Sequence, residues 1–234
     1  MKKKICVIGA NGFVGGALCN EIDNNARYEP VRVTRSDNIR MSIEQADIVI
    51  HAANSSKRYY ANNNPEEDFR DTVEKMAKIL SMVADRKFIL ISTVSAKTQL
   101  DTPYGRHRRA CELMVDQTKN LIFRLSAMYG KQNKKGALFD IIQNNKVFVC
   151  KHTKYALVDV EYNAKKILEF IGECGMRELG AKNYIELGHI AEAIGSTSIF
   201  GERDDSQIPV APPLDAPDAH EAIEFAKREK NEWE

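Results

Sequence analysis

The hydrophobic residues of this chain follow two alternating patterns. Short apolar runs of strand length occur at residues 4–8, 30–34, 46–53, 88–91 and 121–125. Longer segments, in which apolar residues recur every three or four positions, are typical of amphipathic helices. They occur at residues 13–24, 66–84, 104–118, 136–144 and 160–173. Apolar strands separated by helices predict an α/β fold of the Rossmann type, a doubly wound parallel sheet covered by helices on both faces.

The C-terminal part of the chain has a different composition. Four of the seven prolines lie between residues 209 and 217, mixed with Asp and Ser, which is typical of an extended linker. We therefore expect one Rossmann-like domain over residues 1–201, a proline-rich linker over 202–216 and a C-terminal helix over 217–234.

The charge balance limits the classes of partner. The 234 residues include 34 Lys+Arg and 33 Asp+Glu, a formal net charge of +1. Proteins that follow nucleic-acid phosphates normally carry a clear basic excess, so we expect no nucleic-acid binding. Residues 202–234 hold 10 acidic and 4 basic side chains. The remaining body is therefore basic and suited to an anionic small molecule.

The cysteines and the hydrophobic runs indicate the compartment. Five cysteines are spread along the chain without a CxxC pair, which is typical of reduced thiols and predicts neither disulfides nor a metal site. No stretch approaches the roughly 18 apolar residues of a membrane-spanning helix. We expect a cytoplasmic protein that does not bind membranes.

A glycine-rich loop separates the first strand from the first helix. Its glycines are Gly9, Gly12 and Gly15. They allow a tight turn, the approach of a pyrophosphate to the backbone and close packing of the helix, whose N-terminus faces the phosphates. The loop predicts dinucleotide binding rather than a purely structural turn, and the expected contacts are Gly9, Asn11, Gly12, Phe13, Val14 and Gly15.

The end of the second strand indicates which dinucleotide is bound. An acidic residue there binds the adenosine ribose of NAD, whereas an arginine accommodates the 2′-phosphate of NADP. Arg35 occupies this position, which favours NADP. Asp37 follows two residues later and leaves NAD as the alternative.

Six short motifs in the chain resemble, in the same order, those of the extended short-chain dehydrogenase/reductases. This is the NAD-dependent epimerase/dehydratase family, which works on nucleotide sugars. The motifs are the glycine loop and residues 47–53, 88–93, 103–105, 124–130 and 157–159. They cover about residues 3–175. The resemblance implies a Rossmann domain with a small C-terminal substrate-binding part, which we place in segments over about residues 130–201.

The resemblance also implies an active site made by Thr93, Tyr104 and Arg108. In the family, the hydroxyl at the strand end orients the sugar and the tyrosine transfers the proton. A lysine four residues after the tyrosine holds the nicotinamide ribose, and Arg108 stands in its place here. Ala52 and Ala53 are implied to line the cofactor site together with Tyr104 and Arg108.

The substrate side is implied less directly. Val94 and Ser95 stand where dehydratases of the family carry an acid pair, so we do not expect sugar dehydration. Ser95 is interpreted as either a substrate contact or a cap of the turn. Further substrate contacts are expected from the segments after the motif at 124–130, and these are Tyr129, Lys134, Lys151 and Lys154. Lysines suit a diphosphate, although lysines on a solvated surface are the alternative.

Two features keep alternatives open. His51 ends an apolar strand and is interpreted as a structural histidine of the cofactor floor rather than a base. The helices at 66–84 and 104–118 correspond to those that dimerise many family members, and their apolar residues serve either a homodimer or the intrachain core. These residues are Met76, Leu80, Val83, Cys111, Met114 and Val115.

The sequence thus predicts an NADP-linked reductase or epimerase that acts on a nucleotide-activated sugar. The competing hypothesis is an NADP-binding regulatory or scaffold protein without turnover, which the replacement of the family lysine by Arg108 favours. A reductase of a non-sugar carbonyl compound that uses the same residues is a third possibility.

Overall fold

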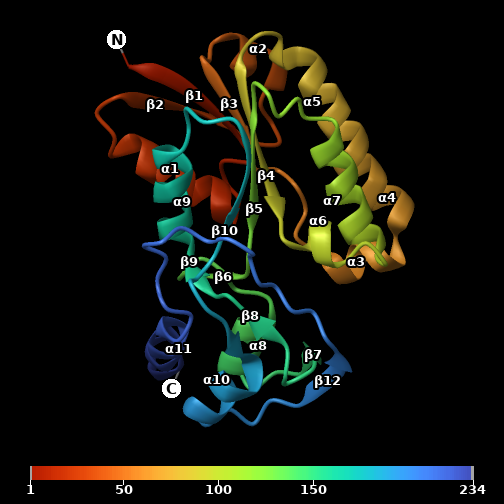
Figure 1. Ribbon diagram of the computed structural model, residues 1–234, viewed down its shortest axis with the longest axis vertical. Helices are drawn as coiled ribbons and strands as arrows, with labels where there is room; N and C mark the ends of the chain where they lie inside the picture. Colours follow the sequence, from red (N-terminus) through yellow and green to blue (C-terminus); the bar gives the residue numbers. More distant parts are fainter. Residues whose placement is uncertain (1, 233–234) are drawn as a thin grey trace. The chain divides into compact units, whose positions relative to one another are not determined.

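The computed structural model describes residues 2–232 and is built around a six-stranded sheet (Figure 1). The strand order is β10-β5-β4-β3-β1-β2. The strands are β1 (Lys3–Ile8), β2 (Tyr28–Val33), β3 (Ile48–His51), β4 (Lys87–Thr93), β5 (Leu121–Leu125) and β10 (Gly175–Leu179). β1 pairs in parallel with β2 and β3, and β3 pairs in parallel with β4. The prediction of a parallel, doubly wound sheet is confirmed, and β10 is a strand that the apolar pattern did not reveal.

The chain divides into two compact units. Unit 1 comprises residues up to 124 together with 164–177, and unit 2 comprises residues 125–163 together with those from 178 onward. Among residues 2–232, no helix has the combined length and hydrophobicity that crossing a bilayer would require.

The helices of unit 1 cover both faces of its sheet, with α1 and α9 on one side and α5 and α7 on the other (Figure 1). The helices are α1 (Phe13–Asp23), α2 (Ile39–Glu44), α3 (Arg58–Asn63), α4 (Pro65–Phe69), the π-helical turn η1 (Arg70–Glu74), α5 (Lys75–Val83), α6 (Ser95–Thr98), α7 (Pro103–Leu113) and α9 (Val160–Glu169), of which residues 164–169 belong to unit 1. The expected helix at 66–84 is helical as far as Val83, with a π turn over residues 70–74, and Ala84 has a left-handed φ of 54° that ends it. α7 ends before residue 118, because Asp116 accepts hydrogen bonds from the backbone and hydroxyl of Thr118 and forms a local turn.

One face of the sheet packs against the apolar residues for which the sequence allows either an intrachain core or a homodimer interface. Met76, Val83, Cys111 and Val115 are buried against the strands, and Leu80 and Met114 pack at the edge of the same cluster. The apolar faces of α5 and α7 therefore serve the intrachain core rather than a free surface.

Unit 2 has a separate core and several short elements. They are β6 (Met128–Tyr129), α8 (Ala137–Ile142), β7 (Val147–Val149), β8 (Lys154–Tyr155), β9 (Val158–Asp159), β11 (Ile185–Glu186), α10 (Leu187–Ala193), β12 (Phe200–Arg203) and α11 (Glu221–Asn231). The core includes Tyr129, Ile141, Leu157, Ile190 and Phe225. Because these strands have only two to four residues each, their hydrophobic pattern is too short to predict them.

The proline-rich segment after β12 is extended and lies along β8. Gln207 donates its amide hydrogen to the carbonyl of Lys154, at 2.9 Å, and accepts from the amide of Ala156, at 3.1 Å. α11 then packs Phe225 into the core of unit 2. Residues 233–234 of the expected C-terminal helix lie outside the described residues.

Candidate active site

The glycine loop is pressed against the end of β3. Gly9 adopts a left-handed backbone conformation with φ of +96°, and a Cβ atom there would lie 2.9 Å from the backbone of Ala52 and of Ala53. The amides of Gly9 and Ala10 both donate to the carbonyl of Val33 at the end of β2, at 2.9 and 3.1 Å. The loop, Ala52 and Ala53 are therefore brought together at the carboxyl end of the strands, where ligands of open α/β sheets bind.

The N-terminus of α1 follows directly. Its N-cap residue is Gly12, which offers no side chain to the free N–H groups, and its first turn has no acidic residue. A Cβ atom on Gly15 would lie 2.1 Å from the carbonyl oxygen of Gly9, so only glycine permits this packing. The other expected contacts are at least partly exposed here: Asn11, Phe13 and Val14. Free N–H groups and the positive end of a helix dipole suit a phosphate.

The turn after β2 carries an exposed arginine and a carboxylate that accepts hydrogen bonds from the turn itself. Asp37 accepts hydrogen bonds from the backbone amide (2.7 Å) and the hydroxyl (2.6 Å) of Thr34. These bonds lower the pKa of Asp37 below its ordinary value. Arg35 is exposed and forms no ion pair with any residue between 2 and 232. The turn therefore presents a cation, whereas its carboxylate is used within the turn.

Thr93 and Ser95 form one hydroxyl pair after β4. Thr93 is the last residue of the strand, and its hydroxyl donates to the Ser95 hydroxyl at 3.4 Å. The Ser95 amide donates back to Thr93 Oγ1 at 3.3 Å. Ser95 is fully buried, whereas Thr93 is partly exposed. Thr93 is thus the hydroxyl of this pair that can meet a ligand, and Ser95 orients it.

Tyr104 lies in the first turn of α7. Pro103 is the first residue of the helix, and the hydroxyl of the N-cap residue Thr102 accepts a hydrogen bond from the amide of Gly105 at 3.0 Å. A Cβ atom on Gly105 would lie 2.1 Å from the carbonyl oxygen of Gln99 and 2.9 Å from that of Ser95. Glycine at position 105 therefore lets α7 begin directly against α6, the short helix that follows Thr93.

Arg108 lies one turn after Tyr104 and is almost completely buried. The central carbon of its guanidinium is 4.5 Å from the centre of the Tyr104 ring. Its nitrogens donate to the hydroxyl of Thr72 (2.6 Å) and to the carbonyl of Ser55, and one lies 3.6 Å from the carboxylate of Asp68. The structure thus brings Tyr104 and Arg108 together, and three residues from two other segments fix the arginine in place.

The partners of Arg108 were not identified from the sequence. Asp68 is buried, and His107 contacts its other carboxylate oxygen at 2.7 Å. Thr72 lies in the middle of the π turn η1, a kind of helix irregularity that is frequent at functional sites. Asp68 and Thr72 are four residues apart on one helical segment, which is the signal that places both side chains on the same side.

His51 ends β3 and is fully buried, as expected of a structural histidine. Burial lowers its pKa to about 3, and the positive charges of Lys75 and Arg108 act in the same direction. Its neutral form is therefore favoured, and an imidazole with so low a pKa is a weak base.

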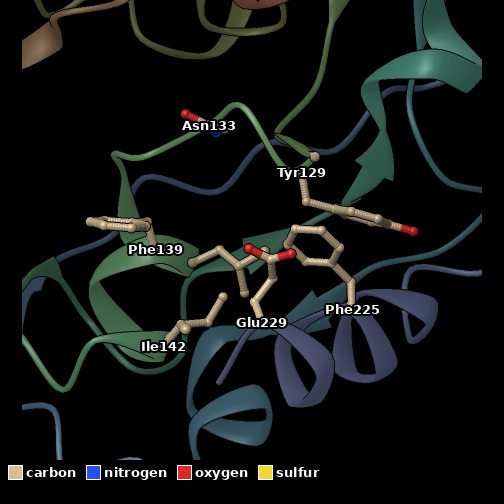
Figure 2. Close-up of a pocket in the computed structure, with 8 residues that line it drawn as sticks. Tyr129, Asn133, Phe139, Ile142, Phe225 and Glu229 are labelled. Carbon is tan, nitrogen blue, oxygen red and sulfur yellow. The ribbon is translucent and has the colours of Figure 1, made fainter. Parts of the chain in front are cut away.

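The four substrate contacts expected after β5 all lie in unit 2. Tyr129 is buried, and its ring packs on Phe225 with 4.8 Å between centres. Burial raises the pKa of Tyr129 to about 12. Figure 2 shows this pair with Glu229 at a small pocket. Its volume of about 20 Å³ is enough for one water molecule.

The lysines of unit 2 differ in their surroundings. Lys134 lies 3.5 Å from the carboxylate of Glu229 on α11, and Lys131 lies 3.7 Å from that of Glu232. Lys154 lies over the ring of Tyr184, 4.9 Å from its centre. Lys151 is exposed. The acidic C-terminal part of the chain therefore balances charge within unit 2, and the pairing of Lys134 leaves it less available to a diphosphate.

A comparison with protein families assigns most of unit 1. Residues 5–146 match the NAD dependent epimerase/dehydratase family. The chain belongs to this family. The resemblance in the sequence motifs is thereby confirmed, and the family is one of enzymes that depend on a nicotinamide dinucleotide.

Individual relatives of this epimerase/dehydratase-family protein agree with the assignment. A UDP-2-acetamido-2,6-beta-L-arabino-hexul-4-ose reductase of Pseudomonas aeruginosa is 29% identical over 142 residues, which are 56% of this chain and 37% of that protein. The chain thus matches little more than a third of that relative.

Solved structures are similar over the whole chain. A dTDP-4-dehydrorhamnose reductase of Bacillus anthracis in complex with NADP has a TM-score of 0.76, 18% identity and coverage of 98% of this chain and 99% of that one. A UDP-N-acetylglucosamine 4-epimerase of Methanobrevibacter ruminantium has a TM-score of 0.76, 14% identity and coverage of 100% and 99%. At these identities the similarity establishes the fold.

Proposed function

We propose that this family member is an NAD(P)-dependent reductase or epimerase that acts on a nucleotide-activated sugar. The observation that carries the proposal is the buried pair of Tyr104 and Arg108 at the start of α7, in the unit that also holds the glycine loop. The named relatives, which include sugar-nucleotide reductases and an epimerase, support this substrate class.

The residues of unit 1 fit a dinucleotide. Gly9, Gly12 and the N-terminus of α1 would hold its diphosphate, and Ala52 and Ala53 would line its site. When bound, the nicotinamide supplies or accepts a hydride. Glycine at positions 9 and 15 supports this assignment, because the absence of a Cβ atom lets the loop pack closely against Ala52 and Ala53 and lets the start of α1 pack against the loop.

We further propose a preference for NADP. Arg35 is exposed just after β2 and has no ion-pair partner among residues 2–232, whereas one oxygen of the Asp37 carboxylate accepts both hydrogen bonds from Thr34. A free guanidinium suits the adenosine 2′-phosphate, and a carboxylate held within its own turn is a poor partner for the ribose hydroxyls of NAD. The neighbour from Bacillus anthracis contains NADP, whereas another neighbour contains NAD.

The chemistry of the chain's own residues is a proton transfer. The Tyr104 hydroxyl would exchange a proton with the substrate oxygen, and the Thr93 hydroxyl would hold that oxygen by a hydrogen bond. The Arg108 guanidinium lies against the Tyr104 ring, and the nearby Asp68 carboxylate offsets part of its positive charge. Arg108 therefore orients the ring and supplies a reduced positive charge.

Replacement of Tyr104 by phenylalanine tests the proposal. Because Phe lacks the proton that the reaction moves, Tyr104→Phe is expected to lower turnover at least about a hundredfold, with the affinity for NADPH unchanged. Turnover is measured as nicotinamide oxidation with a panel of 4-keto nucleotide sugars and as epimer exchange with UDP-sugars. Tyr28→Phe is the matched control, because Tyr28 begins β2 and lies away from the carboxyl end of the strands. This variant should leave turnover unchanged.

The same experiment separates the alternative function. The three bonds that hold Arg108 to Asp68, Thr72 and Ser55 favour an NADP-binding protein without turnover. A wild-type protein that binds NADPH but converts no substrate in the panel would support that alternative. Equal turnover by wild type and Tyr104→Phe would reject the role given to the tyrosine.

We also propose a homodimer that uses the outer surfaces of α4, η1, α5 and α7, since their inner surfaces form the core.

The five cysteines are free thiols, which supports a cytoplasmic location for the protein.

A further inference from the structure

Lys75 is a partly buried cation next to the glycine loop. It is the first residue of α5, and its ammonium donates to the carbonyl oxygen of Ala53 at 2.6 Å. The loop rests on this same segment, because a Cβ atom on Gly9 would lie 2.9 Å from the backbone of Ala53. The Lys75 ammonium is therefore held at the floor of the proposed dinucleotide site.

The positive charge of Lys75 is not balanced by an ion pair. No carboxylate forms a salt bridge with Lys75 in the described part of the chain. Burial lowers the pKa of Lys75, the Asp71 charge opposes this effect, and the charges of Arg108 and Arg35 add to it. Arg108 and Arg35 are thus each close enough to Lys75 to act on its charge, and a partly buried cation without an ion-pair partner is costly. A bound anion would relieve both effects.

The ammonium also has unused hydrogen-bonding capacity. A lysine ammonium has three donors, and the carbonyl of Ala53 takes one of them. Charge-assisted hydrogen bonds to phosphate oxygens are among the strongest available to the remaining donors. The anion class that suits this position is a phosphate.

We propose that the Lys75 ammonium binds a phosphate of the dinucleotide and, together with Arg35, sets the affinity of the protein for its cofactor. This inference rests on the proposed function, since it requires that a dinucleotide occupy the glycine loop. Lys75 acts in binding and takes no part in the proton transfer.

The decisive comparison uses Lys75→Gln and Lys78→Gln. Lys78 is one turn further along α5, exposed and 3.9 Å from Glu74, so the control removes the same charge outside the site. Dissociation constants for NADPH and NADH are measured by nicotinamide fluorescence. Lys75→Gln is expected to weaken NADPH binding about tenfold or more, and Lys78→Gln is expected to leave it unchanged. Lys75→Arg, which keeps the charge, should retain most of the affinity.

The two cofactors distinguish the phosphate that is bound. A loss with NADPH alone assigns Lys75 to the 2′-phosphate, and an equal loss with both cofactors assigns it to the diphosphate. Unchanged NADPH affinity in a folded Lys75→Gln variant overturns the inference while the proposed function stands. A wild-type protein that binds neither cofactor overturns the proposed function as well.

A second measurement avoids substitution altogether. Wild-type protein is acetylated with an amine-reactive reagent, and the modification of Lys75 and Lys78 is followed by mass spectrometry with and without NADPH. Bound NADPH is expected to slow the modification of Lys75 several-fold and to leave that of Lys78 unchanged. Equal rates at Lys75 with and without bound NADPH would overturn the inference.

Discussion

Arg35 and Arg108 are both unusual arginines, but their surroundings give them opposite roles. Arg35 is exposed and without an ion-pair partner among the described residues, so it can meet a ligand phosphate. Arg108 is 2% exposed and is bound by Asp68, Thr72 and Ser55. The two guanidinium groups therefore differ in their surroundings. That of Arg35 is an exposed cation, whereas that of Arg108 is a fixed part of the site.

The free guanidinium of Arg35 predicts the cofactor preference. Arg35→Ala is expected to raise the dissociation constant of NADPH about tenfold or more, because a charge-assisted bond to the 2′-phosphate is lost, and to leave that of NADH unchanged. Isothermal titration of both cofactors measures the two constants. Arg27→Ala, next to Tyr28 at the other end of β2, is the matched control. A similar loss for NADPH and NADH would contradict the preference.

At the scale of elements, one buried ion pair ties α7 to the sheet. Glu112 on α7 is fully buried and accepts from Arg124 on β5 at 2.8 and 2.6 Å. It also accepts from the hydroxyl of Ser92 on β4 at 2.7 Å. Because Tyr104 and Arg108 lie on the same helix, this network holds both of them in register with Thr93 at the end of β4.

Removal of this carboxylate is expected to destabilise the protein strongly. Glu112→Ala removes the buried carboxylate that Arg124 contacts twice, and breaking a buried ion pair costs about 3–5 kcal/mol. The free energy of unfolding is measured by urea denaturation. Glu66→Ala, which removes an exposed partner of Arg70 at 3.7 Å, should cost no more than about 1 kcal/mol. Equal effects of the two substitutions would show that the network is not a structural tie.

At the scale of the whole molecule, the charged side chains of the two units differ in their ion-pair partners. The acidic C-terminal part pairs Glu229 and Glu232 with Lys134 and Lys131 within unit 2. In unit 1, Arg35 and Lys75 remain without such partners in the described chain. The basic excess that the sequence indicates therefore includes two cations of unit 1, of which Lys75 contacts the segment against which the glycine loop packs.

The outer surfaces of the two long helical segments predict the oligomeric state. Phe69 on α4 is 42% exposed and Leu113 at the end of α7 is 69% exposed, and the proposed dimer would cover both side chains. We expect twice the monomer mass of 26.4 kDa in sedimentation experiments, and a shift of Leu113→Glu toward the monomer. Leu214→Glu, at an exposed position in unit 2, is the control. A monomeric wild-type protein would contradict the proposal.

The sequence by itself determined the features that depend on neighbouring residues. Alternation of apolar runs predicted the parallel sheet, and the steric demands of Gly9 and Gly15 predicted the loop, because both depend on short-range geometry. It also placed Tyr104 and Arg108 one helical turn apart. The sequence did not predict the π turn, because its pattern is too similar to that of an ordinary helix. It did not predict the short strands of unit 2, because their patterns are too brief.

Only the tertiary structure decided what each charged side chain does. Arg108 meets Thr72 and Ser55, 36 and 53 residues away in the chain, and Lys75 meets the carbonyl of Ala53, 22 residues away. Such contacts depend on how helices pack on the sheet, which no local pattern specifies. Burial then decides whether a charge is satisfied within the protein or left for a ligand, because the cost of an unpaired charge rises as water is excluded.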